Sequence, residues 1–294
     1  MPRSTRTAPS SRARWLVVGA VALIGVALVA IVVVRGSGGV ATATAWARLG
    51  TQDVHALRFE PGTTTDRLLF GHHGGLLATS DGGRTWAPGS ARADAMSLST
   101  PGGDRLVIAG HLVFQESRDG GATWADIPAD LPSMDIHAFA QSSLAPDRMW
   151  AYLAGGGVHR SEDGGVTWTE VFAGDIVGLV AVSQDGGDVL LGIDPFAGLA
   201  RSTDGGSVWT AVSKPPASPV TSLAATPDGS VLVLGGPRGL YRSDDGGTTW
   251  RQVLASRTVL AAAISEDGTV LAAVTDDTVY YRSDDAGATW QGPS

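Results

Sequence analysis

The stretch Ser161–Trp168 reads SEDGGVTW, and similar octapeptides occur five more times along the chain. The other copies are TSDGGRTW (Thr79–Trp86), SRDGGATW (Ser117–Trp124), STDGGSVW (Ser202–Trp209), SDDGGTTW (Ser243–Trp250) and SDDAGATW (Ser283–Trp290). Their aspartates are separated by 38, 44, 41, 41 and 40 residues, a period typical of four-stranded propeller blades. Six copies predict an all-β fold, a six-bladed β-propeller.

The composition of the octapeptide suits a tight hairpin turn. Its Asp can accept backbone N–H groups, and the Gly that follows can adopt a positive φ. Its Trp can begin the next strand as an apolar anchor. The copies depart from this pattern only at Val208, which replaces Thr, and at Ala286, which replaces Gly. We therefore interpret all six aspartates as residues that build the fold.

Each period contains the segments of one blade. In the first period DVHALRF (53–59) predicts the inner strand a, DRLLFG (66–71) strand b and GLLATS (75–80) strand c, and strand d begins at Trp86. Blades 2 to 6 begin near Asp94, Asp135, Asp175, Pro219 and Thr258. The sixth blade has little chain left for its strand d. We expect Trp46–Leu49 to supply that strand and close the ring, because an open edge would leave backbone groups unpaired.

The composition excludes several classes of protein. The 294 residues include no Cys, which rules out disulfide scaffolds, zinc-thiolate sites and cysteine nucleophiles. Basic residues number 21 against 29 acidic ones, a formal charge of −8. Five of the basic residues precede position 36, so the rest of the chain has 16 basic and 29 acidic residues and a charge of −13. This balance argues against a nucleic-acid partner.

The N-terminal region has the pattern of a membrane anchor. Residues 15–34 carry no charge and are long enough for one transmembrane helix. Four Arg precede them and Arg35 follows, which favours a cytoplasmic N-terminus. We predict a basic cytoplasmic tail (1–14), a transmembrane helix (15–35), a flexible tether (36–45) and an extracytoplasmic propeller (46–294) in the cell membrane. A cleaved signal peptide is the alternative, although its apolar part is usually shorter.

Side chains that differ among the six repeats are candidates for function. The starts of strand a carry Asp and then, two residues later, His or Met in the first three blades. In a propeller these starts share one face, at the channel mouth, with the loops between strands b and c. The candidates that converge there are His55, His72, His73, Met96, His111 and His137, accompanied by Asp53, Asp94 and Asp135.

This set of residues is chemically suited to a soft or borderline metal. Asp53 and His55 are two residues apart, as are Asp135 and His137, so each pair lies on one side of its strand. A carboxylate beside an imidazole commonly orients a metal-bound His. Histidines with one thioether favour copper, and then zinc. The alternative is that these histidines only make hydrogen bonds in a wet channel mouth. Calcium held by the aspartates is a weaker alternative, because no close run of oxygen ligands occurs.

The octapeptide resembles the Asp-box, or BNR repeat, of sialidases, sortilin-type receptors and the photosystem II assembly factor family, and the resemblance spans residues 44–294. The segments DVHALRF, GHHGG, AGH and DIHAF also look like those of bacterial membrane-anchored proteins labelled BNR-repeat glycosyl hydrolases. The resemblance implies that the six His and Met candidates are shared features of that group. It implies no role for them.

Three functions remain open from the sequence. The first is a binding or assembly module for an extracytoplasmic protein or glycan, with copper or zinc at its mouth. The second is a metal-free interaction scaffold, and the third is a sialidase-like exo-glycosidase. A sialidase site needs three Arg and a Tyr paired with Glu. Tyr152 shows no acidic neighbour in the sequence, and the repeated Arg160, Arg201, Arg242 and Arg282 indicate solvent-facing blade positions. We therefore favour a non-enzymatic role and leave enzyme status open.

Overall fold

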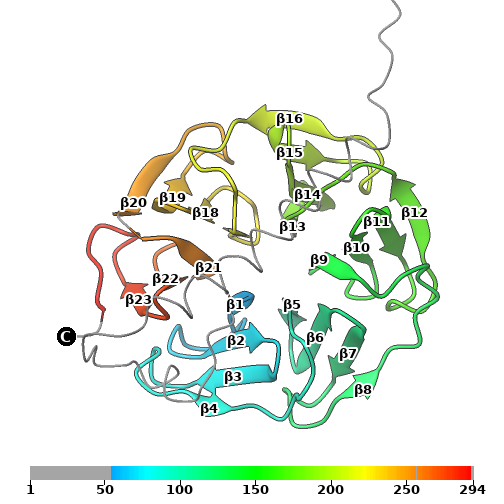
Figure 1. Cartoon of the computed structure of the whole chain (residues 1–294), viewed down its shortest axis with the longest axis horizontal. Helices are drawn as coiled ribbons and strands as arrows, with labels where there is room; N and C mark the ends of the chain where they lie inside the picture. Colours follow the sequence, from blue (N-terminus) through cyan, green and yellow to red (C-terminus); the bar gives the residue numbers. More distant parts are fainter. Residues whose placement is uncertain (1–53, 256, 293–294) are drawn as a thin grey trace, which may run out of the picture. The chain divides into compact units, whose positions relative to one another are not determined.

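The computed structural model describes residues 54–255 and 257–292. They form six antiparallel sheets arranged as the blades of a propeller (Figure 1). Blade 1 comprises β1 (Ala56–Phe59), β2 (Leu68–His72), β3 (Gly75–Thr79) and β4 (Ala87–Pro88). Blade 2 comprises β5 (Ser97–Gly102), β6 (Arg105–Gly110), β7 (Val113–Ser117) and β8 (Ala125–Asp126). Blade 3 comprises β9 (Ile136–Gln141), β10 (Met149–Leu153), β11 (Gly157–Ser161) and β12 (Thr169–Phe172).

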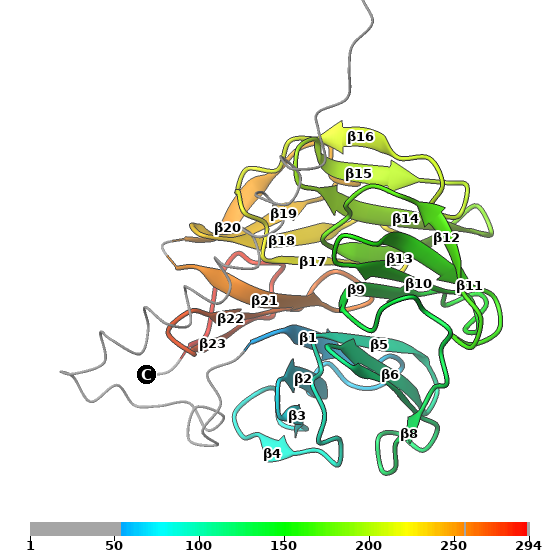
Figure 2. The ribbon, with the colours of Figure 1, turned by 45° about the vertical axis from the view of Figure 1, so that its right-hand side comes forward.

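The remaining blades follow in chain order around the ring, as the colours of Figure 2 show. Blade 4 comprises β13 (Leu179–Gln184), β14 (Gly187–Asp194), β15 (Gly198–Ser202) and β16 (Thr210–Ser213). Blade 5 comprises β17 (Ser222–Ala225), β18 (Leu232–Gly236), β19 (Gly239–Ser243) and β20 (Arg251–Ala255). Among the described residues, blade 6 has the three strands β21 (Val259–Ile264), β22 (Leu271–Thr275) and β23 (Tyr280–Ser283). The prediction of an all-β, six-bladed propeller is confirmed.

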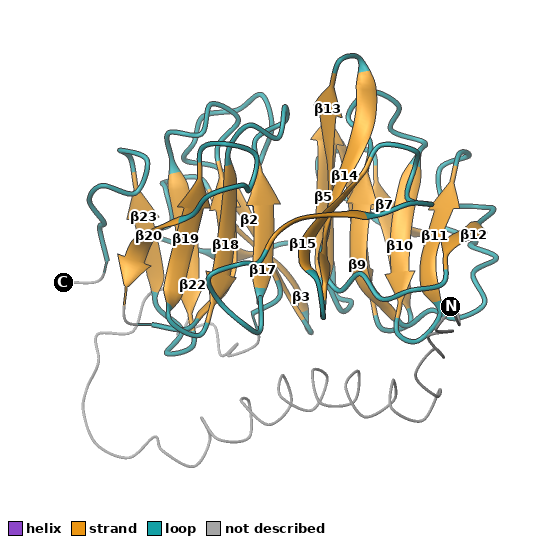
Figure 3. Cartoon of the chain, turned by 90° about the horizontal axis from the view of Figure 1, so that it is seen from above, coloured by secondary structure: helices purple, strands orange, loops and turns teal. Residues whose placement is uncertain are grey.

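The described part of the chain consists of strands and loops (Figure 3). Within residues 54–255 and 257–292, no helix is long and apolar enough to span a bilayer. The predicted tail, transmembrane helix and tether lie outside the described residues, as does Trp46–Leu49, the segment expected to close the ring. In blade 6, Gln291 pairs with Arg282 through two backbone hydrogen bonds of 2.9 and 2.7 Å. The C-terminal segment thus begins a fourth strand there.

The octapeptides form the turns between strands c and d. In the third copy, the Ser161 hydroxyl donates to Asp163 Oδ1 at 2.8 Å, and the Thr167 hydroxyl donates to Oδ2 at 2.6 Å. The backbone N–H of Thr167 also donates to Asp163 Oδ1, at 2.9 Å. Both glycines of the turn have positive φ, and Ala286 takes the same conformation in the sixth copy with φ 59°. The aspartates therefore hold the turns together, as the composition of the octapeptide suggested.

The hydrogen bonds of the turn stabilise the ionised aspartate. The Thr hydroxyl, the Thr backbone N–H and the Ser hydroxyl lower the pKa to about 2 in four copies: Asp119, Asp163, Asp245 and Asp285. In the copy with Val208, the backbone N–H of Val208 and the Ser202 hydroxyl lower the pKa of Asp204. No hydroxyl at position 208 contributes to that shift.

Apolar side chains fill the six interfaces between adjacent blades. One cluster joins blades 1 and 6, where Leu57 and Phe70 pack with Ala261, Val274 and Tyr280. The other five clusters occupy the other five interfaces in the same way. The ring is therefore closed by side-chain packing between the first and last blades, which removes exposed sheet faces from solvent.

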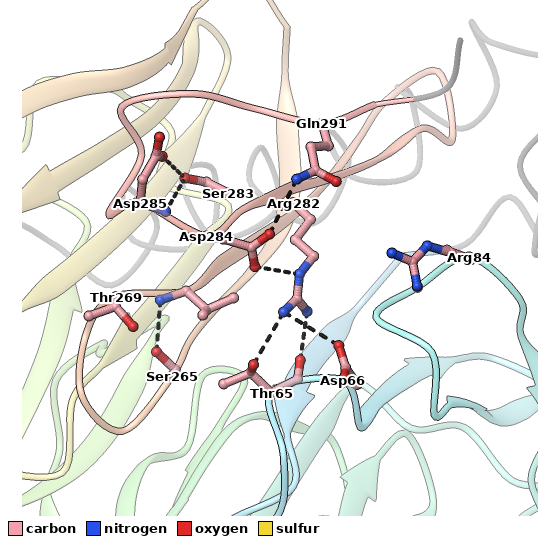
Figure 4. A network of polar contacts seen from close by, with 12 residues as sticks. Thr65, Asp66, Arg84, Ser265, Thr269, Arg282, Ser283, Asp284, Asp285 and Gln291 are labelled. Carbon is pink, nitrogen blue, oxygen red and sulfur yellow. Dashed lines mark hydrogen bonds and ion pairs between the residues drawn. The ribbon is translucent and has the colours of Figure 1, made fainter.

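A repeated arginine also joins neighbouring blades. Arg282 Nη1 in blade 6 donates to the backbone O of Thr65 in blade 1 at 2.6 Å, and Nε donates to Asp284 at 2.8 Å (Figure 4). Arg242 in blade 5 likewise donates to the backbone O of Gly268 in blade 6. The side chains of these two arginines are only 11% and 8% exposed. The expectation that the repeated arginines face solvent is wrong for them, because the next blade's a–b turn covers them.

Candidate functional site

The loops between strands b and c carry histidines toward the next blade. The N–H of Ala95, at the start of blade 2, donates to the carbonyl of His72 at 3.1 Å. The N–H of Leu112 donates to the carbonyl of Met134 at 2.9 Å, and His111 forms a backbone bridge with Asp135. Each loop is thus attached to the start of the following strand a. This pairing brings together the imidazoles and carboxylates of three blades.

The first group of side chains contains His55, His73 and Asp94. One possible ligand atom from each residue lies within 4.8 Å of those of the other two. Nε2 of His55 lies 3.0 Å from Nδ1 of His73, and the two rings meet edge to face with centroids 4.3 Å apart. The group joins blades 1 and 2.

The second group contains His111, Asp135 and His137, again with ligand atoms within 4.8 Å of one another. Oδ1 of Asp135 lies 3.0 Å from Nε2 of His137 and 3.3 Å from Nε2 of His111. The rings of His111 and His137 meet edge to face, 5.1 Å apart. This group joins blades 2 and 3.

Asp94 connects the two groups. Its Oδ2 lies 3.0 Å from Nδ1 of His111 and accepts the His111 backbone N–H at 3.3 Å. The rings of His73 and His111 stack at 6.5 Å with an interplanar angle of 10°. The Asp94 side chain is only 12% exposed, and its Oδ1 is buried without a hydrogen-bond partner among the described residues. A buried carboxylate oxygen that accepts no hydrogen bond is suited to bind a cation.

The remaining candidates lie differently. Met96 lines a small cavity of about 110 Å³ that His55 and His137 also line. His72 accepts the N–H of Gly74 through Nδ1 at 3.0 Å and belongs to neither group. Asp53, expected to orient His55, lies outside the described residues.

The donor set fits a transition metal. Nitrogen and carboxylate oxygen atoms bind zinc at about 2.0–2.2 Å, so ligand atoms about 3–4 Å apart can surround one ion, and those nearer to 4.8 Å apart need a small side-chain movement to do so. Imidazole suits zinc and copper alike, and the thioether of Met96 favours copper. His55, His73 and Asp94 can hold one ion, and His111, Asp135 and His137 can hold another. Either would act as a Lewis acid or as a link to a partner.

Tyr152 provides no exposed nucleophile of the sialidase kind. Its hydroxyl donates to Asp175 Oδ1 at 2.9 Å, so the statement that it lacks an acidic neighbour is wrong. The residue is 2% exposed. Burial, and then Asp175, raise the pKa of its phenol. The carboxylate was missed because Asp175 starts the next blade, 23 residues away.

Sequence analysis also missed Arg58. This residue lies on the inner strand β1 and lines two cavities of the central channel. One extends to the a–b turns, and the other is the small cavity that His55 and His137 line. The alignment of the six blades contained a signal, because the corresponding residues are Ser99, Ala140, Val180, Ala224 and Ala263. A single charged residue among small and apolar ones is as much an exception as the histidines are.

Comparison with known proteins shows the fold. No protein-family model matches the chain, and no curated protein is similar to it. Among solved structures, YCF48 from Cyanidioschyzon merolae has a TM-score of 0.51 and 20% identity, over 82% of this chain and 84% of that one. A GH74 xyloglucanase from Xanthomonas campestris has a TM-score of 0.55 and 18% identity, over 82% of this chain and 45% of the enzyme.

A third similar structure is the extracellular domain of a putative hybrid two-component system from B. thetaiotaomicron. Its TM-score is 0.53 with 14% identity, over 82% of this chain and 32% of that one. These neighbours include a GH74 xyloglucanase and two proteins that are not described as hydrolases. At such identities they establish the propeller and carry no activity over to this chain.

Proposed function

We propose that the chain is a membrane-anchored, extracytoplasmic binding module whose channel mouth binds zinc or copper. The observation that carries the proposal is the convergence of four imidazoles and two carboxylates from three blades. Within each of the two groups, the ligand atoms lie within 4.8 Å of one another. The buried, unpartnered Oδ1 of Asp94 supports it, because a bound cation would satisfy that oxygen.

Metal titration of the full chain tests the proposal. Calorimetry with Zn²⁺ and with Cu²⁺ should give saturable binding, and elemental analysis after dialysis should find retained metal. The double variant His55→Ala plus His137→Ala removes one ligand from each group and should abolish both signals. His159→Ala is a control, because that buried histidine belongs to neither group. Equal binding by the double variant and the wild type would refute the proposal.

The anchor and location are part of the same proposal. Residues 15–35 carry the apolar character of a transmembrane helix, and the arginines before them favour a cytoplasmic N-terminus. Protease added outside intact cells should therefore degrade the propeller, while a tag before residue 15 stays protected. Degradation of the tag instead of the propeller would show that the N-terminus lies outside the cell.

A protein partner is the second candidate function. Leu112 and Phe196 are 87% and 70% exposed at the tips of b–c loops, on the face that carries the histidines. A solved structure described as YCF48 bound to D1 peptide has a TM-score of 0.50 and 20% identity with this chain. Leu112→Ser plus Phe196→Ser should reduce cross-linking to a partner at the membrane. Val208→Ser, on the opposite face, should leave cross-linking unchanged.

A further inference from the structure

The central channel contains a charged residue that the metal proposal does not use. Arg58 lines a cavity of about 670 Å³ that extends to the a–b turns, on the face opposite the histidines. The corresponding residues of the other blades line the same cavity and are small or apolar: Ser99, Ala140, Val180, Ala224 and Ala263. Because these side chains are short, the cavity stays open beside Arg58.

Arg58 has no carboxylate partner among the described residues. Its Nη1 donates to the backbone O of Leu57 at 3.3 Å, which is its one hydrogen bond within that part of the chain. The acidic side chains of the cavity are already engaged. Glu60 pairs with Arg67 at 2.7 Å, Glu266 accepts the N–H of Gly62 at 3.2 Å, and Asp267 accepts the hydroxyls of its own turn.

A second unpartnered group lines the same cavity. Gln141 is 7% exposed, and its Nε2 donates to the backbone O of Pro146 at 2.6 Å. This bond fixes the orientation of the amide and leaves Oε1 as an acceptor. That oxygen is buried without a hydrogen-bond partner among the described residues. The cavity thus contains a cation without a counterpart, and Gln141 in its wall has a buried acceptor oxygen without one.

Arg58 is a half-buried cation without an ionic partner among the described residues, which is unfavourable. Burial lowers the pKa of Arg58, which reflects the cost of removing its charge from water. A bound oxyanion offsets that cost, and the planar guanidinium can hold a carboxylate or a phosphate through two parallel hydrogen bonds. The cavity volume also falls in the range of small-molecule sites, about 300–1,000 Å³.

We infer that this cavity is a second binding site, which takes a small oxyanion, a carboxylate or phosphate group, on Arg58. A hydroxyl or amino group on the same ligand would donate to Gln141 Oε1 once that buried side chain turns toward the cavity. The site uses none of the histidines and lies on the opposite face of the propeller. The outcome of the test for anion binding is therefore independent of whether the histidines bind a metal.

Thermal unfolding of the full chain with added anions tests this inference. Acetate, glycolate and inorganic phosphate are added at about 20 mM, with sodium chloride at matched ionic strength as the reference. At least one anion should raise the unfolding midpoint by about 2 °C or more relative to chloride. Acetate and glycolate together report carboxylate binding, and phosphate reports the alternative. A larger effect of glycolate than of acetate would support the donor to Gln141.

Two variants make the test specific. Arg58→Met keeps much of the side-chain volume but removes the charge, and it should abolish the anion effect. Arg251→Met, at an arginine that is 52% exposed, should keep it. A cooperative unfolding transition and a far-ultraviolet circular dichroism spectrum equal to that of the wild type show that Arg58→Met is folded. The inference is overturned if no anion exceeds chloride, or if a folded Arg58→Met responds as the wild type does.

Discussion

Nε2 of His111 in blade 2 lies 3.3 Å from Oδ1 of Asp135 in blade 3, and the same two residues form a backbone bridge between the blades. The b–c loop of blade 2, which carries His111, is therefore fixed beside Asp135 at the start of blade 3. His111 also contacts Asp94 at 3.0 Å through its other ring nitrogen. The ring lies between the two groups of ligands and contacts a carboxylate of each.

This position predicts a large effect of His111→Ala on metal affinity. We expect zinc or copper affinity to fall about tenfold or more, because one group loses a ligand and Asp94 loses its neighbour. His72→Ala should change the affinity less than about twofold, since His72 belongs to neither group and its Nδ1 accepts the N–H of Gly74. Calorimetric titration checks both variants. Equal losses would mean that the two groups do not define the site.

The fourth octapeptide offers a stabilising substitution. Val208 is 63% exposed and stands where all five other copies have a Thr whose hydroxyl donates to Asp Oδ2 at 2.6 Å. Val208→Thr restores that bond to Asp204. We expect a gain of about 0.5–1 kcal/mol in the free energy of unfolding, or about 2 °C in the midpoint.

Val166→Thr is the matched control for this substitution. It adds the same hydroxyl one position earlier in the third octapeptide, where Thr167 already donates to Asp163. Thermal unfolding of both variants, compared with the wild type, measures the two changes in stability. A gain from Val166→Thr as large as that from Val208→Thr would show that the hydrogen bond to the aspartate is not the cause.

The fold was predictable because its information is local and repeated six times. Each octapeptide needs only its own residues to form its turn: Ser161 and Thr167 bond to Asp163 within seven residues of sequence. The order of the blades then follows from the order of the copies. The convergence of the histidines could also be anticipated, since corresponding positions of a ring share one face.

Contacts between neighbouring blades could not be predicted from such local sequence patterns. Arg282 looks like an exposed, charged blade residue until the a–b turn of blade 1, more than 200 positions away, covers it. Tyr152 and Asp175 meet for the same reason, because the end of one strand b lies beside the start of the next strand a. The role of Asp94 as a link between two groups depends on loop geometry, which the sequence does not specify.

The low pKa values of the octapeptide aspartates predict acid sensitivity. Hydrogen bonds from the Thr hydroxyl, the Thr N–H and the Ser hydroxyl lower the pKa of Asp119 from 3.8 to about 2, and three other copies behave alike. A carboxyl with a lower pKa in the folded state stabilises the fold above its unfolded pKa. That contribution is lost as the pH falls from about 4 toward 2.

We therefore expect the unfolding midpoint to fall steeply between about pH 4 and pH 2. Thr123→Val, which removes the largest of the contributions at Asp119, should make this decrease shallower. Thr169→Val, at an exposed position of β12, should leave the slope unchanged. Calorimetric scans across this pH range measure all three proteins. If the unfolding midpoint of Thr123→Val fell with pH as steeply as that of the wild type, Asp119 would not be a cause of the acid sensitivity.

The contact between Arg282 and Thr65 predicts how the ring opens. The guanidinium donates to the backbone O of Thr65 and lies 3.6 Å from Asp66, while Asp284 accepts from its Nε (Figure 4). Arg282→Ala leaves the Thr65 carbonyl without this donor, so we expect a loss of about 1–3 kcal/mol in the free energy of unfolding, measured with urea. Arg201→Ala is the control, because Arg201 has the same repeat position but donates to Gln184 within its own blade. Hydrogen exchange should quicken in β1 and β23 of Arg282→Ala and stay unchanged in blade 3. If exchange quickened equally in all six blades, Arg282 would stabilise the whole ring rather than its closure.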